Sequence, residues 1–202
     1  MPDLTLFHTA EVHVETFRRL APEADLCQQV RADWLAQAQG GISPELAQVI
    51  AETIQAASGP VLCTCTTLGE VAEQAGATRL DWPMMQEAAR IGGPILLTYC
   101  LESTAQPSTT LLQRAFDQAD TKAEIHPLAL PHLWQHFESG ETELFAQGIA
   151  EAIIEELERA PAPACVVLAQ ASMAGAAEIL QEQTDVPALT SPAIAMKQLL
   201  GK

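Results

Sequence analysis

The sequence predicts an α/β fold of two similar lobes, each built on a parallel sheet, and three observations support this. Short apolar runs alternate with helical stretches along the 202 residues, an order typical of parallel α/β sheets. Segments of the first half recur in the second half in the same order. Hydrophobic residues make up 48% of the chain and aromatic residues 4%, so Ala, Leu, Val and Ile must form the core.

The expected strands are short apolar runs. They are LTLFHT at 4–9, DLCQQV at 25–30, PVLCTC at 60–65, ATRLD at 77–81, PILLTY at 94–99, AEIHPLAL at 123–130, ACVVLAQ at 164–170 and VPALTS at 186–191. Two of the helices between them carry clear signals. One follows Ser43, a good N-cap residue, with Pro44 at the first helical position. The other is ETELFAQGIAEAIIEELERA from Glu141.

Three matching pairs of segments indicate an internal repeat. AQVIAETI at 47–54 matches AQGIAEAI at 146–153 in six of eight positions. VLCTCTTLGEVAE at 61–73 matches VLAQASMAGAAEI at 167–179, which pairs Gly69 with Gly175 and Cys65 with Ala171. DWPMMQEAA at 81–89 matches TSPAIAMKQ at 190–198 at their prolines.

The repeat predicts two Rossmann-like lobes related by a pseudo-twofold axis. We expect the first at 1–92 and the second at 93–189, with 190–202 able to pack back on the first. Open α/β sheets bind ligands beyond the carboxyl ends of their strands. We therefore expect the active site in the cleft between the lobes.

The composition excludes some classes of partner and setting. The net charge is −16, from 26 acidic and 10 basic residues, so there is no basic stripe for nucleic acid, and binding to anionic membranes is not expected. No apolar run reaches the ~20 residues of a membrane helix. The opening MPDLTLFHTAEVHVE lacks a signal-peptide pattern. The five cysteines lie in apolar segments, which argues against disulfides. We expect a cytoplasmic protein, and its small-residue helices are compatible with a homodimer.

Small hydroxyl side chains gather at the ends of the predicted strands, where cations are scarce. Such a set suits carboxylates held by hydroxyls and by the N–H groups of helix N-termini. The first half contributes His8, Thr9, Cys63, Thr64, Cys65, Thr66, Thr67 and Asp81, and the second contributes Thr98, Tyr99, Ser103, Thr104, Gln170, Ala171, Ser172, Met173, Thr190 and Ser191.

Cys65 is the most distinctive residue of this set. It precedes Thr67-Leu-Gly-Glu70, which has the form of a capping box, so we expect a helix from about Thr67. A thiol beside a helix N-terminus is favoured as thiolate. Cysteines in apolar strands are otherwise inert packing, and that is the expectation for Cys27, Cys100 and Cys165. Cys63 lies two residues deeper, as packing or support for Cys65.

Metal and cofactor motifs are not found. His132 and His136 have the i, i+4 spacing of two metal ligands, but a third ligand is missing. The glycine spacing of phosphate-binding and dinucleotide-binding loops is missing, as is a Gly-x-Ser-x-Gly elbow. We expect no metal and no cofactor.

Cys65-Thr66-Thr67, together with two similar lobes and a strand-to-helix junction in each, resembles the aspartate/glutamate/hydantoin racemase superfamily. The resemblance covers the whole chain. In that family the first junction reads Cys-Asn-Thr and the second Gly-Cys-Thr-His. Here the second junction reads Gln170-Ala171-Ser172-Met173, so the chain resembles a divergent member that keeps only the first of the two cysteines.

The resemblance implies a cofactor-independent racemase or isomerase that moves a proton at the carbon next to the carboxylate of a small acid or amino acid. Cys65 would be the acid/base, and His8 could serve as a second base. Asp81 would orient a substrate amine or cap the helix before Pro83. The expected substrate-binding residues are Thr66, Thr67, Thr98, Ser103, Thr104, Gln170 and Ser172.

Three alternatives stay open. One is a malonate-type decarboxylase in which a single cysteine acid protonates the carbon that carbon dioxide leaves. The second is a non-catalytic protein that binds a small carboxylate, which the missing cysteine favours. The third is a nucleophilic Cys65 that forms a covalent adduct.

Overall fold

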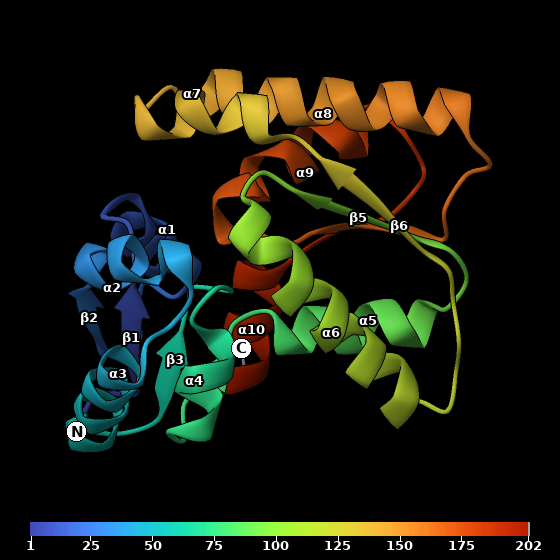
Figure 1. The fold of residues 1–202 in the computed structure, drawn as a ribbon. Coiled ribbons are helices and arrows are strands. Elements are labelled where there is room, and N and C mark those ends of the chain that lie inside the picture. Colours follow the sequence, from blue (N-terminus) through green and yellow to red (C-terminus); the bar gives the residue numbers. More distant parts are fainter. Residues whose placement is uncertain (202) are drawn as a thin grey trace. The chain divides into compact units, whose positions relative to one another are not determined.

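A computed structural model describes residues 1–201, which form two parallel four-stranded sheets (Figure 1). The first sheet has the order β2-β1-β3-β4, and the second has the order β6-β5-β7-β8. The strands are β1 (Leu4–His8), β2 (Leu26–Val30), β3 (Val61–Cys63), β4 (Thr78–Arg79), β5 (Ile95–Tyr99), β6 (Ile125–Ala129), β7 (Cys165–Leu168) and β8 (Ala188–Thr190). Each lies within one of the predicted runs, and the α/β fold with two parallel-sheet lobes is confirmed.

The helices connect successive strands, as parallel sheets require. They are α1 (Val12–Leu20), α2 (Ala32–Gln37), α3 (Pro44–Ala56), α4 (Gly69–Gln74), α5 (Trp82–Ile91), α6 (Glu102–Gln118), α7 (Trp134–Glu138), α8 (Thr142–Arg159), α9 (Ala174–Gln183) and α10 (Ser191–Leu200). Short 3₁₀ helices lie at η1 (Ala38–Gly40), η2 (Pro131–Leu133) and η3 (Ala171–Met173). None of the helices in 1–201 is long and apolar enough to cross a membrane.

The chain divides into two compact units that exchange helices. The first unit is 1–82 with the segment from Pro192 onward, and the second is 83–191. The sequence placed the boundary after residue 92, so the two divisions differ by α5, which the structure groups with the second unit. The segment after Ser191, which contains most of α10, is grouped with the first unit.

The core of the first unit lies between its sheet and helices α2, α3 and α4. Phe7 of β1 packs there against Trp34 of α2, with 5.5 Å between the ring centroids. Cys63 and Cys65 belong to the same buried cluster. Helix α1 contributes Phe17, whose ring centroid lies 5.2 Å from that of His8.

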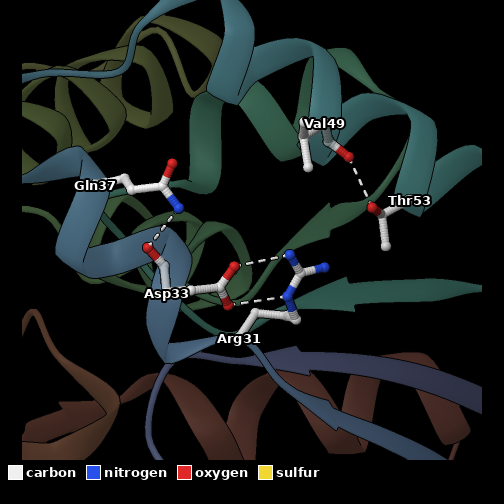
Figure 2. Close-up of polar contacts among 5 residues, drawn as sticks. All are labelled: Arg31, Asp33, Gln37, Val49 and Thr53. Atoms are coloured by element: carbon white, nitrogen blue, oxygen red, sulfur yellow. Dashed lines mark hydrogen bonds and ion pairs between the residues drawn. The ribbon is translucent and has the colours of Figure 1, made fainter.

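The start of α2 carries an exposed Arg-x-Asp pair (Figure 2). Arg31 donates from Nε and Nη2 to the two oxygens of Asp33, over 3.0 and 2.9 Å. Its guanidinium also lies 4.1 Å from the ring centroid of Trp34, a cation–π contact. These contacts fix the turn between β2 and α2.

The second unit has helices on both faces of its sheet. Helices α8 and α9 lie on one side of β5 and β6, and α5 and α6 on the other (Figure 1). The first layer buries Phe145, Ile149 and Ile153 of α8 against Leu96 and Val166 of the strands. The small side chains of α9 allow close packing against α8, so that a Cβ on Gly175 would lie 3.3 Å from Ala146 Cβ.

One predicted helix start is confirmed and another is wrong. Ser43 caps α3, with its hydroxyl accepting from the Leu46 N–H at 3.2 Å and Pro44 in the first turn. The capping box at Thr67 does not form: α4 begins at Gly69, Leu68 is its N-cap, and no side chain caps it. Residues 66–68 form a turn instead, closed by the Gly69 N–H on the Thr66 carbonyl at 3.1 Å.

Candidate functional site

Cys65 lies where β3 of the first unit ends and the turn before α4 begins. Its side chain is buried, with 8% of the residue exposed. The hydroxyls of Thr9 and Thr67 and the backbone N–H groups of Thr67 and Leu68 lie near enough to its sulfur to lower the pKa of the thiol. These donors favour negative charge on the sulfur, and burial opposes it more strongly.

The resting thiol of Cys65 differs from the expected thiolate. Burial raises its pKa above the ordinary value, and the hydrogen bonds from Thr9, Leu68 and Thr67 lower the pKa without overcoming the burial. The helix that was expected to activate the thiol is short and begins only at Gly69, four residues later. Cys65 is therefore a protonated thiol at neutral pH, surrounded by groups that stabilise the thiolate once the proton leaves.

Cys63 is packed in the same buried cluster as Cys65. Its thiol donates to the Cys65 carbonyl at 3.7 Å, and burial raises its pKa to about 12. Both properties are those of packing, since a thiol with such a pKa is inert at neutral pH.

His8 is fully buried and both of its ring nitrogens have partners. Nδ1 lies 2.9 Å from Thr64 Oγ1, and Nε2 lies 2.9 Å from Gln28 Oε1. Burial lowers the pKa of His8, against a smaller rise from the bond to Gln28. None of the interactions found within 1–201 joins His8 to Cys65. These contacts favour a hydrogen-bonded structural histidine, and the role of second base stays a prediction.

Asp81 belongs to a buried ion pair that sequence reasoning missed. Arg79 donates to both Asp81 oxygens at 3.0 Å, and the two side chains are 5% and 2% exposed. The guanidinium lies against Gly69, where an added Cβ would come within 2.7 Å of Arg79 Nε. The Arg-x-Asp spacing was visible in the sequence, but its burial was not. Since Arg79 occupies both oxygens, the suggested contact of Asp81 with a substrate amine stays a prediction.

The second unit places the remaining predicted residues at the ends of β5 and β7. Thr98 is fully buried, and its hydroxyl has no hydrogen-bond partner within 1–201; the same holds for the buried hydroxyl of Ser172 in η3. Ser103 and Thr104 lie in the first turn of α6. Gln170 Oε1 accepts from the Cys100 N–H at 2.6 Å and from the Leu101 N–H at 3.0 Å.

The two sheets fix which residues correspond between the units. The Thr64 N–H donates to the carbonyl of Phe7 on β1, and the Ala169 N–H donates to the carbonyl of Thr98 on β5. Thr64 therefore corresponds to Ala169, and the next residues, Cys65 and Gln170, correspond to each other. The repeat is confirmed, but the sequence match paired Cys65 with Ala171, one residue away from the pairing that the sheets give. The sequence match followed identical Val, Leu and Gly residues, whereas the true pairing follows the hydrogen bonds between the strands.

Within residues 1–201, the arrangement supplies a buried thiol and hydrogen-bond donors. Among residues 1–201, no three His, Cys, Asp or Glu side chains are grouped so that they could hold a metal ion. The first unit offers a buried thiol whose pKa lies above its ordinary value, with nearby donors that offset part of the rise. The second offers neutral donors at the equivalent strand end.

Replacing Thr9 by valine tests the donors around Cys65. The change removes a hydroxyl that lowers the thiol pKa, so the thiolate fraction and the alkylation rate at pH 8 should fall. A hydrogen bond to a charged group contributes about 1.5–3 kcal/mol, which corresponds to a decrease of about tenfold or more. Iodoacetamide labelling followed by mass spectrometry measures the rate at Cys65. Thr53→Val on α3, whose hydroxyl bonds only its own helix, is the control, and equal rates in both variants would contradict the prediction.

Comparison with known proteins finds similarity of three-dimensional structure only. No protein-family model matches the chain, and no curated protein matches its sequence. A glutamate racemase from Bacillus anthracis superimposes with a TM-score of 0.71 at 14% identity, covering 98% of this chain and 80% of that one. An aspartate racemase from Picrophilus torridus gives 0.66 at 13% identity over 98% and 94%.

An allantoin racemase from Klebsiella pneumoniae gives a TM-score of 0.61 at 19% identity, over 98% of this chain and 86% of that one. The agreement extends over nearly the whole chain and includes both lobes. The fold of this chain is similar to the folds of these glutamate, aspartate and allantoin racemases, as the resemblance in sequence predicted.

Proposed function

We propose that this protein is a cofactor-independent enzyme of the racemase or isomerase type, which transfers a proton at the carbon next to the carboxylate of a small acid or amino acid. The observation that carries the proposal is the buried thiol of Cys65 just after β3, with the donor groups of Thr9, Thr67 and Leu68 beside it. The racemase fold supports it as well.

In the proposed step the Cys65 thiolate takes the proton, and the electron pair of the C–H bond stays on the substrate carbon next to the carboxylate. Return of the proton by the same thiol exchanges the hydrogen without inversion, and inversion requires a donor on the opposite face, the role predicted for His8. Removal of such a proton places charge beside an anion, so the carboxylate must be held by donors. Thr66 and Thr67, in the turn after Cys65, are proposed for this role.

Decarboxylation of a malonate-type acid is the second candidate, and the raised pKa of Cys65 favours it. A protonated resting thiol is the form that a proton donor needs. In this reaction the bond to one carboxyl group breaks, carbon dioxide leaves, and the electron pair stays on carbon. Cys65 then gives its proton to that carbon, and the thiolate is reprotonated from water.

Hydrogen exchange in D₂O tests the proposal. The substrates are the two enantiomers of aspartate and of glutamate, with malonate and phenylmalonate for the second candidate. We expect loss of the Cα proton signal in the NMR spectrum, or release of carbon dioxide from a malonate. We expect Cys65→Ser to lower the rate by about 10²–10⁴-fold, the usual contribution of an acid/base group.

The matched control is Cys27→Ser, which changes an exposed cysteine of the same unit and should leave the rate unchanged. An undiminished rate in Cys65→Ser would overturn the assignment. If the wild-type protein binds these acids but exchanges no proton and releases no carbon dioxide, it is a carboxylate-binding protein instead.

A further inference from the structure

The side-chain amide of Gln170 is held in one orientation by the backbone. Its Oε1 accepts from two consecutive N–H groups, those of Cys100 and Leu101, at 2.6 and 3.0 Å. Turning the amide over would place its NH₂ group against these two donors, so the oxygen must face them. Leu101 is the N-cap residue of α6, which means that Gln170 ties the end of β7 to the start of α6.

This orientation leaves the NH₂ group of Gln170 available. The residue is only 8% exposed, yet none of the hydrogen bonds found within 1–201 uses Nε2. Nε2 is not one of the fully buried atoms without a partner, so it keeps some contact with solvent. Its two N–H donors are fixed in direction by the bonds that Oε1 accepts, and they can meet a ligand that supplies an acceptor.

A second donor without a partner lies close by in the sequence. Ser172, in the 3₁₀ turn that follows Gln170, has a buried hydroxyl oxygen that bonds to nothing within 1–201. Both groups follow β7, at the edge of the sheet where parallel strands bind ligands. Neither is charged, and both can donate.

The registers of the two sheets show that different chemical groups occupy equivalent positions in the two units. Gln170 corresponds to Cys65, so the two units place an amide and a thiol at equivalent strand ends. A side-chain amide neither gains nor loses a charge near neutral pH, so it cannot act as an acid or base, whereas a thiol can. The amide therefore suits binding, and the thiol suits proton transfer.

We propose that Gln170 is the carboxylate-binding residue of the second unit, donating from Nε2 to a carboxylate oxygen of the ligand with the Ser172 hydroxyl as its partner. This rests on the proposed function for the ligand class, a small carboxylate, and adds the residue that recognises it and the reason that the second unit needs no cysteine.

Gln170→Glu separates binding from structure. The glutamate carboxylate still accepts from the Cys100 and Leu101 N–H groups, and more strongly, so thermal stability should be retained. It lacks the N–H donors and carries the same charge as the ligand, so affinity should fall by tenfold or more. Gln170→Leu loses the acceptor as well and should melt at a lower temperature. Gln135→Glu, on exposed Gln135 of α7 in the same unit, is the control for the change in net charge.

The measurement is titration of ¹⁵N-labelled protein with malonate and with glutamate, followed in the side-chain amide NMR signals. All variants are made in the Cys65→Ser background, so that no turnover occurs. The Gln170 signal, identified by its loss in Gln170→Glu, should shift with the probe. The proposal is overturned if neither probe shifts it, or if Gln170→Glu binds as tightly as Gln135→Glu. The proposed function would fail separately, through proton exchange that survives Cys65→Ser.

Discussion

Asp81→Asn is expected to lower the free energy of unfolding by about 3–5 kcal/mol, the usual effect of removing one partner of a buried ion pair. The substitution keeps the shape of the side chain and removes its charge. Arg79, which is 5% exposed and donates to both Asp81 oxygens, then remains as an uncompensated buried cation. Urea unfolding followed by circular dichroism measures the change.

The chain offers a matched control in the exposed pair of Arg31 and Asp33 (Figure 2). The two pairs have the same Arg-x-Asp spacing and the same two-bond geometry, but the side chains of Arg31 and Asp33 are 27% and 52% exposed. Asp33→Asn should change stability by only about 0–1 kcal/mol. Similar losses in both variants would show that burial is not what makes the Arg79–Asp81 pair important.

Stability should fall steeply above about pH 8.5. Burial raises the pKa of Cys63, Cys100 and Cys165 to about 12 each, whereas a thiol in the unfolded chain titrates near 8.5. Between these values the folded state keeps protons that the unfolded state releases, so the stability present below pH 8.5 is lost as pH rises towards 12. Each thiol contributes about 1.4 kcal/mol per pH unit, and three give about 4 kcal/mol per pH unit.

Urea unfolding at pH 8, 9 and 10 in the presence of a reductant measures this slope. The sequence has a single tyrosine, so few other groups titrate in this range. Cys63→Ala should reduce the slope by about 1.4 kcal/mol per pH unit, and Cys27→Ala, which changes an exposed cysteine, should leave it unchanged. A stability that is flat between pH 8 and 10 would contradict the expectation.

The strands could be predicted from the sequence because local patterns determine them. Strands buried on both faces read as short apolar runs, as in PILLTY and ACVVLAQ, and Ser43 with Pro44 marks a helix start by chemistry that needs no tertiary contact. The same reasoning failed at Thr67, where residues 66–68 form a turn and α4 begins only at Gly69. Thr67 lies beside the thiol of Cys65 and lowers its pKa, so a capping-box pattern alone does not determine where the helix starts.

The site was predictable in its residues more than in its chemistry. Cys65 was singled out by its position, but the sign of its pKa shift depends on burial, which a helix signal does not report. Gln170 was placed among the binding residues, but its correspondence to Cys65 follows only from the hydrogen bonds of the two ladders. Similarity between Ala-rich segments leaves a shift of one residue undetected.

The exchange of helices between the units has a consequence for the order of folding. The second unit is a continuous stretch, 83–191, whereas the first needs the segment from Pro192 onward, whose Ala195 and Met196 are buried. A ribosome makes this segment after the whole of the second unit, and domains tend to fold as units while they emerge. The half that is translated first is therefore the half that is completed last, and until then it exposes the surface that α10 covers.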